Sequence, residues 1–162
     1  MTINETQAQA VIRCLEIDVD FYRELTVFLM KKHDKILEDD LGWLTESLNK
    51  EQAYVMKSRS LEDKRISLFE GLGLGGMKLS EITENSPEEY RPKMKMLSGQ
   101  LTELIDGIKS LNAETNEVVK RKLDNQREFV KRAGILEKPE TYNRNASKVA
   151  GGQSSAKAFR QV

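Results

Sequence analysis

The stretch LSGQLTELIDGIKSL, residues 97–111, has the clearest secondary-structure signal in the chain. Leucine or isoleucine recurs in it at positions 97, 101, 104, 108 and 111, with alternating spacings of four and three residues. Such a heptad pattern forms one apolar seam along a helix and is typical of coiled-coil packing. The sequence therefore predicts a helix from about residue 92 to residue 133, roughly 60 Å long at a rise of about 1.5 Å per residue.

The two ends of this predicted helix have different signals. Ser86 and Pro87 form a typical helix start, with Ser as the N-cap, yet Pro92 would remove a hydrogen bond from such a helix and favours a regular start near Arg91. At the other end, Gly134 is a suitable stop, because glycine adopts the left-handed conformation cheaply. Between residue 111 and this stop the seam continues, but several of its positions are polar. These positions hold Thr115, Val118, Lys122, Asn125 and Phe129.

Two further long helices are predicted earlier in the chain. Residues from about 8 to 38 contain no Gly or Pro and show apolar residues at helical spacing. That first stripe consists of Val11, Leu15, Asp18, Tyr22, Leu25, Leu29 and Ile36. A second helix runs from about residue 41 to residue 70, and its stripe consists of Leu41, Leu44, Leu48, Val55, Ile66 and Phe69.

The connections between the predicted helices are less determined. Asp39 or Asp40 can cap the second helix by accepting a backbone N–H, but the sequence leaves open whether the chain reverses at residues 39–42 or continues as one kinked helix. The glycine-rich segment from Gly71 to Gly76 ends the second helix. A loop through Asn85 follows, with a short turn predicted at residues 79–83.

The overall composition excludes several classes of protein. The chain has 162 residues, enough for one domain, and its 26 basic and 26 acidic residues give no net charge. This balance provides no long-range attraction to nucleic acid or to an anionic membrane. No apolar run approaches the roughly 20 residues of a membrane span, and no signal peptide is recognisable at the N-terminus. We therefore expect a cytoplasmic protein without nucleic-acid binding or membrane insertion.

The sequence offers no constellation for catalysis, cofactor binding or metal binding. His33 is the only histidine, which excludes histidine-rich metal sites, and it is interpreted as a polar residue at the edge of the first helix. Cys14 lies on the apolar face of that helix and is interpreted as a small core residue. The Gly71–Gly76 segment follows a helix, whereas a dinucleotide-binding loop follows a strand. We expect no catalytic residue, no cofactor and no metal, and hence no enzyme.

These elements predict an all-α fold: an elongated antiparallel bundle of three to four long helices with coiled-coil-like packing. The bundle is assigned to residues 1–137. Residues 138–162 are interpreted as a flexible C-terminal tail, because isolated apolar residues among Asn, Ser, Gly and Lys cannot offset the entropy of ordering.

A partner site is predicted at the end of the longest helix. Two helices of about 30 residues cannot cover a helix of about 42, and uncovered apolar helix surface favours binding of a partner helix. The basic residues of this region alternate with Glu117, Asp124 and Glu128, which indicates a solvated face. The predicted partner-binding residues are Val118, Val119, Leu123, Phe129, Val130, Ile135 and Leu136.

Several motifs together resemble the FlgN family of flagellar type III export chaperones. The first block is Leu25-x-x-Phe28-Leu29 with Ile36-Leu37-x-x-Asp40-Leu41-x-x-Leu44, and the second is Leu61-Glu62-x-x-Arg65-x-x-Leu68-Phe69-x-x-Leu72-Gly73. The third is Leu104-x-x-x-Ile108-x-x-Leu111-Asn112-x-x-x-Asn116, followed by Thr141-Tyr142 before a polar end. The order and spacing of these blocks are similar to the family pattern from about Leu25 to Tyr142.

The resemblance implies a cytoplasmic chaperone rather than an enzyme. Such a protein would bind the hook–filament junction proteins FlgK and FlgL, prevent their premature assembly or degradation, and deliver them to an export gate component. Tyr142 is the residue expected to contact the gate, and the polar seam at Thr115, Lys122 and Asn125 would keep cargo binding reversible. The alternative is a helical coiled-coil adaptor or self-assembling structural protein, and a homodimer is possible in either case.

Overall fold

The computed structural model describes residues 1–134, which form three long helices and one short helix. The long helices are α1 (Glu5–Leu37), α2 (Leu41–Gly71) and α4 (Arg91–Arg132), and the short helix is α3 (Leu79–Asn85). The predicted all-α fold and its three long helices are confirmed. The proposed tail, residues 138–162, and the boundary drawn at residue 137 lie outside the described residues.

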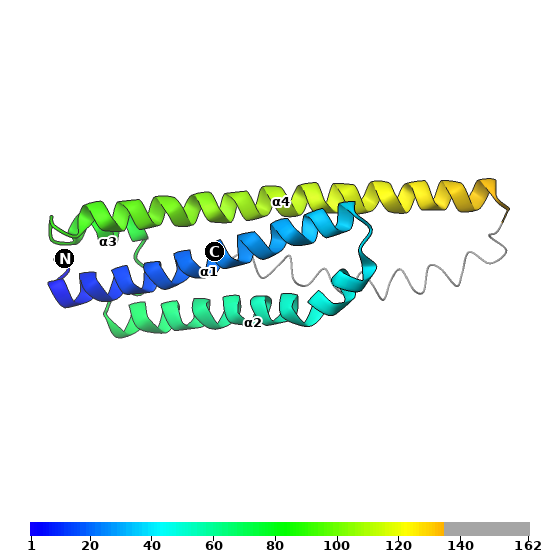
Figure 1. Ribbon diagram of the computed structural model, residues 1–162. Helices are drawn as coiled ribbons and strands as arrows, with labels where there is room; N and C mark the ends of the chain where they lie inside the picture. Colours follow the sequence, from blue (N-terminus) through cyan, green and yellow to red (C-terminus); the bar gives the residue numbers. More distant parts are fainter. Residues whose placement is uncertain (135–162) are drawn as a thin grey trace.

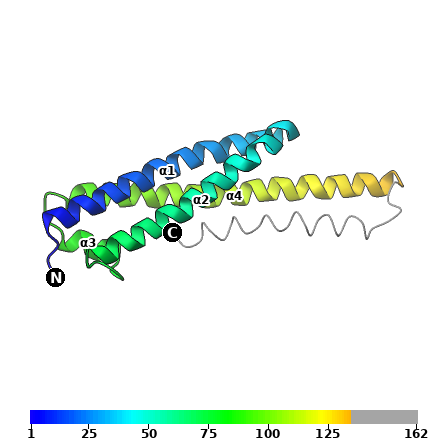
Figure 2. The same ribbon diagram turned by 90° about the horizontal axis from the view of Figure 1, so that it is seen from below.

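The long helices lie side by side, with α1 between α2 and α4 (Figure 1). Successive long helices run antiparallel, so α1 and α4 point in the same direction (Figure 1). Seen from below, α2 crosses the other two helices obliquely (Figure 2). Among the described residues α1 packs against both neighbours, whereas α2 and α4 make no close backbone approach to each other. The core is therefore centred on α1.

The interface of α1 with α4 buries the seam that the heptad pattern predicts. Leu97, Leu101 and Ile108 of α4 are buried, as are the α1 residues Leu15 and Leu25. The remaining seam residues of α4, Leu104 and Leu111, are half-buried and pack against the same core. The periodicity at residues 97–111 thus marks the face of α4 that α1 covers.

The chain reverses between α1 and α2, which settles the alternative that the sequence left open. Asp39 adopts a left-handed conformation with φ 57°, and the Asp40 N–H donates to the Lys35 carbonyl at 3.0 Å. Asp40 also caps α2, because its carboxylate accepts the Trp43 N–H at 3.0 Å. This backbone hydrogen bond lowers the pKa of the Asp40 carboxyl. The segment is a tight turn and not a kink.

The opposite end of the bundle is closed by packing and backbone hydrogen bonds. Gly73, with φ 73°, ends α2, and the Leu74 N–H donates to the Phe69 carbonyl at 2.8 Å. The Ile3 N–H donates to the Asn85 carbonyl at 3.0 Å, which fastens the N-terminus to the end of α3. The side chains packed at this end are almost inaccessible to solvent, namely those of Ile3, Leu74, Ile82 and Met94.

The helix start near Arg91 that Pro92 favours is confirmed, and the alternative start at Ser86 and Pro87 is wrong. Ser86 is instead the C-cap of α3, where its buried hydroxyl donates to the Ile82 carbonyl at 2.7 Å. Pro92 lies in the first turn of α4, where its missing N–H leaves no helical hydrogen bond unmade.

The face that α2 buries differs from its apolar stripe. The buried residues of α2 are Ser47, Tyr54 and Ser58. Two members of the stripe, Leu41 and Leu48, are 72% and 56% exposed. Because α2 contacts only α1 among the described helices, the stripe has no helix to cover it.

Candidate partner-binding surfaces

The last part of α4 extends beyond the turn that joins α1 to α2, as both views of the ribbon show (Figures 1 and 2). The helix has 42 residues, against 33 in α1 and 31 in α2. Its last buried residue is Thr115. We call residues 116–132 the terminal segment of α4. The prediction that the shorter helices leave the end of the longest one uncovered is confirmed for the helices of residues 1–134.

Two polar contacts fasten the turn to α4 at the start of the terminal segment. His33 Nδ1 lies 2.8 Å from Thr115 Oγ1, and the Lys122 ammonium lies 2.7 Å from the Asp39 carboxylate. Thr115 is buried and His33 is half-buried, as a polar residue at the edge of α1 should be. Thr115 and Lys122 therefore hold α4 against the end of α1 and the turn that follows it.

The predicted partner residues within the terminal segment lie at the surface to different degrees. Val119, Leu123 and Phe129 are 36%, 48% and 68% exposed. Val118 and Val130 are half-buried. Three other predicted residues, Ile135, Leu136 and Tyr142, lie outside the described residues. The structure thus places an apolar surface on the terminal segment where the sequence predicts one.

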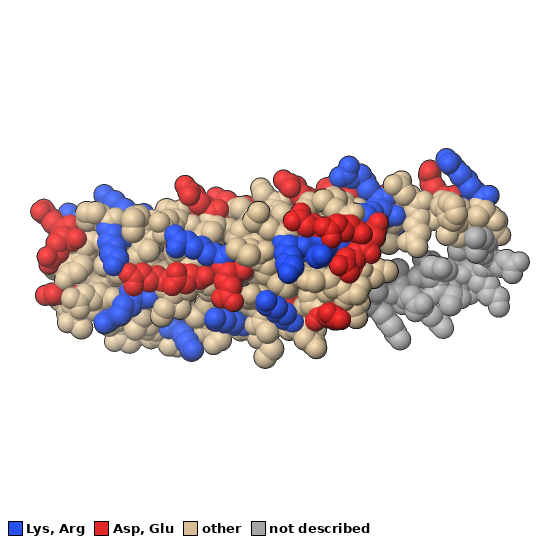
Figure 3. Space-filling view, viewed as in Figure 1, with Lys and Arg blue, Asp and Glu red and all other residues tan. Residues whose placement is uncertain are grey.

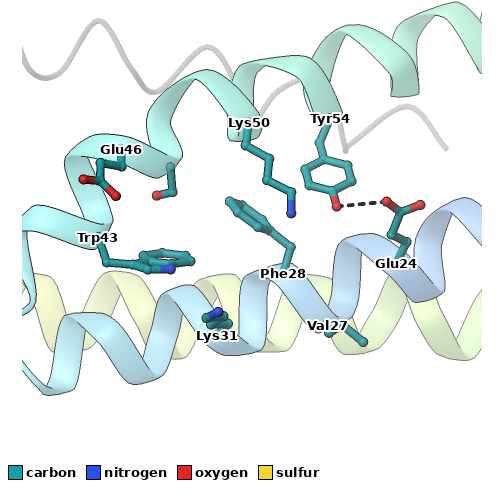
Figure 4. A pocket seen from close by; sticks show the side chains of 9 residues that line it. Glu24, Val27, Phe28, Lys31, Trp43, Glu46, Lys50 and Tyr54 are labelled. Atoms are coloured by element: carbon teal, nitrogen blue, oxygen red, sulfur yellow. Dashed lines mark hydrogen bonds between the residues drawn. The ribbon is translucent and has the colours of Figure 1, made fainter.

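A second apolar surface, which the sequence did not reveal, is a groove of about 560 Å³ between α1 and α2. Aromatic rings form its floor (Figure 4). The centroid of Phe28 lies 5.0 Å from that of Tyr54 and 5.8 Å from that of Trp43. The Tyr54 hydroxyl donates to Glu24 at 3.1 Å, which fixes one end of the groove (Figure 4).

Lysine side chains border this groove and lie over its rings. The Lys31 ammonium is 5.8 Å from the Trp43 centroid, and that of Lys50 is 5.7 Å from the Phe28 centroid. Such cation–π contacts are worth about 0.5–1 kcal/mol at exposed sites. The sequence signal for the groove is Phe28, an apolar residue of the first helix that lies outside its predicted stripe.

A smaller groove of about 300 Å³ lies between α1 and α2 at the other end of their interface. It is lined by Cys14 and by an ion pair in which Arg65 lies 3.1 Å from the Asp18 carboxylate. Burial raises the pKa of Asp18, and the Arg65 guanidinium opposes that rise. Burial, reinforced by the Asp18 charge, raises the pKa of Cys14 to about 11, so its thiol is protonated at neutral pH. This supports the interpretation of Cys14 as a packing residue.

The described residues were compared with the requirements of a metal site, a charged patch and a membrane span. Residues 1–134 contain no group of His, Cys, Asp or Glu side chains that could hold a metal ion. On the face seen in Figure 3, acidic and basic side chains are interspersed along the bundle. In the part of the chain that the structure describes, no helix has both the length and the apolar character of a membrane span.

The comparisons with known proteins give one match. A family model described as FlgN protein matches residues 1–149, which covers every described helix and most of the chain. No curated protein and no solved structure matches the sequence.

Proposed function

Because the chain belongs to the FlgN family of flagellar export chaperones, we propose that it binds the hook–filament junction proteins FlgK and FlgL. It holds them in the cytoplasm, prevents their premature assembly or degradation, and delivers them to the flagellar type III export apparatus. The proposed binding site is the terminal segment of α4. The observation behind this proposal is the exposure of Val119, Leu123 and Phe129 past the end of α1.

The physical basis is the length mismatch between α4 and its neighbours. An amphipathic helix of the cargo, laid along the terminal segment, would continue the covering that α1 provides to the earlier part of α4. Burial of apolar surface contributes about 25 cal/mol per Å², so a helix of a few turns supplies a moderate and reversible affinity. While it is bound, that cargo helix is unable to pair with another subunit, which is how a chaperone delays assembly.

Two further parts of the proposal concern residues outside the described ones. Ile135 and Leu136 follow from the same helix-length argument and would extend the apolar surface past α4, whereas Tyr142 would contact the export gate on the family resemblance alone. Replacement of Tyr142 by Ala should then weaken gate binding while leaving FlgK binding intact. Equal gate binding by the Tyr142→Ala chain would remove this residue from the proposal.

The test of cargo binding uses the full chain with purified FlgK and FlgL, analysed by light scattering on a sizing column. We expect a defined complex with the native chain. Val119→Glu, Leu123→Glu and Phe129→Glu should each weaken it, because a carboxylate at an apolar contact must be desolvated when cargo binds. All three positions are exposed in the free chain, so the variants should fold.

A matched control is Met56→Glu on α2, a position that is 71% exposed and lies on another helix. It introduces the same charge at an apolar surface residue far from the terminal segment in the chain. If the three α4 variants bind cargo as well as the Met56→Glu chain does, the terminal segment is not the cargo site. A native chain that forms a tight homo-oligomer and binds neither FlgK nor FlgL would favour a structural adaptor instead.

A further inference from the structure

The terminal segment has a regular arrangement of side chains around its apolar stripe. Val119, Leu123 and Val130 share a face with Gln126, at spacings of four, three and four residues. This repeats the spacing of the buried seam one residue out of register, a rotation of about 100° from the positions that continue the seam. The stripe therefore has the geometry of a coiled-coil face that no described helix covers.

A column of basic residues borders one side of this stripe. Lys120, Arg127 and Lys131 each follow a stripe position directly, and one residue is a rotation of about 100° around a helix. They lie seven and four residues apart, so they are aligned along the same flank, and Asp124, which directly follows Leu123, is the one acidic residue among them. All three are exposed, and none forms an ion pair with a described residue. This flank corresponds to the position that sets charge pairing in coiled coils.

Two of the three acidic residues of the segment lie elsewhere. Glu117 and Glu128, like Arg121, occur two residues before stripe positions, a rotation of about 200° that places them on the far side of the helix. Glu128 is directed to Arg132, at 3.7 Å, in an exposed pair. The other flank of the stripe is occupied by Val118, Lys122, Asn125 and Phe129, and its one charge, that of Lys122, is paired with Asp39. The flank that holds Lys120, Arg127 and Lys131 thus has the larger excess of positive charge.

We infer that the terminal segment binds an amphipathic helix whose apolar stripe is bordered on one side by Asp or Glu. This inference rests on the proposed function for the identity of the cargo, and it adds the chemistry by which the cargo helix is chosen. Apolar contact with Val119, Leu123 and Val130 supplies affinity. Pairing of acidic residues with the basic column selects one rotation of the partner helix and rejects helices with basic flanks.

The decisive experiment reverses the basic column in the full chain, as Lys120→Glu, Arg127→Glu and Lys131→Glu together. A matched control reverses Lys95, Lys109 and Arg121, which are also exposed and unpaired among the described residues but lie away from this flank. Both variants change the net charge equally, so a difference between them reports local contact and not overall charge. Circular dichroism of both chains checks that the helical content is retained.

Two designed amphipathic peptides serve as probes, alike in their apolar stripe but with Glu on the flanks of one and Lys on those of the other. The native chain and the control should bind the Glu-flanked peptide at least about tenfold more tightly than the Lys-flanked one. The chain with the reversed column should instead bind the Lys-flanked peptide more tightly. Added salt should weaken the preference, because exposed ion pairs are screened. FlgK binding should fall at least about tenfold in the reversed chain and remain near native in the control.

The outcomes separate this inference from the proposed function. If both triple variants and the native chain prefer the same peptide to the same degree, the inference is overturned, whatever the result with FlgK. If column reversal inverts the peptide preference but none of the chains binds FlgK, the surface for an acidic-flanked helix stands and the proposed cargo is wrong. If Leu123→Glu abolishes FlgK binding while column reversal has no effect, the cargo site stands and its charge selectivity is overturned.

Discussion

The first and last parts of α4 form one continuous helix with the same apolar spacing, yet they have different surroundings. From Met94 to Thr115 the seam is covered by α1, and Met94 and Ile108 are almost inaccessible to solvent. From Val118 onward apolar residues recur at helical spacing with no described helix to cover them, and Phe129 is 68% exposed. What separates buried seam from exposed apolar surface in this helix is the length of α1.

This difference is a consequence of where the α1–α2 turn lies. Asp39 and Asp40 end α1 and begin α2, so neither helix can continue along α4. A longer α1 would convert the terminal segment into core, at the expense of the proposed site. The opposite end of the molecule shows the closed alternative, where α3 and the N-terminus pack against the start of α4 and leave Ile82 buried.

The strongest test of this comparison replaces one apolar residue in each part of α4. Ile108→Ala should lower the free energy of unfolding by about 2–5 kcal/mol, because it leaves a cavity under α1. Leu123→Ala should change it by no more than about 0.5 kcal/mol, because the side chain is 48% exposed. Urea unfolding followed by circular dichroism measures both. Similar losses at the two positions would show that the terminal segment is covered in solution and would contradict the comparison.

Much of this contrast could be predicted from the sequence. The heptad at residues 97–111 gave the buried face of α4, and the helix lengths gave the uncovered end. The excess of positive charge on one flank of the terminal segment could not be predicted in the same way, because the alternation of charges in the sequence indicates only a solvated face. It becomes visible only once the exposure of Val119 and Leu123 shows which side of the helix the other helices leave open.

The smaller groove between α1 and α2 is intermediate in coverage between the two parts of α4. The reactivity of Cys14, which lines this groove, measures that coverage. Its pKa of about 11, against an ordinary value of 9.0, should slow alkylation by iodoacetamide at pH 8. Each pH unit is a factor of about ten in thiolate, so the native rate should be about 100-fold below that in denaturant. Cys14 is the only cysteine, which makes the unfolded chain its own control. Comparable rates would mean that α2 leaves this flank of α1 open.

The same pKa shift has a consequence for stability. A raised pKa in the folded state means that the protonated thiol stabilises the fold relative to the thiolate. This stabilisation is complete below pH 9.0 and is lost as the pH rises to about 11. The free energy of unfolding should fall over that range more steeply in the native chain than in a Cys14→Ser chain. Parallel curves for the two chains would contradict the shift.

The sequence was less informative about α2 than about α4. The apolar stripe of α2 lies beside the face that it buries, because Tyr54 and the Arg65–Asp18 pair seat the helix on α1 instead. A pattern of apolar residues identifies a helix and one of its faces, but it does not say which neighbour that face will meet. The polar contacts that decide the seating of α2 join residues 47 positions apart. No local pattern could reveal them.

The smallest expected effect lies at the border between the two parts of α4, where Thr115 meets His33. Thr115→Val retains the volume of the side chain but removes the hydroxyl that lies 2.8 Å from the His33 ring. The cost should be about 1 kcal/mol, because the ring is half-buried and loses its partner. Thr102→Val is the matched control on the same helix, since its exposed hydroxyl bonds only to the Ser98 carbonyl, and it should change stability by less than about 0.5 kcal/mol. Urea unfolding of the two chains gives the difference. If Thr115→Val costs no more than Thr102→Val, this contact does not fix the border, and the uncovered part of α4 begins before residue 115.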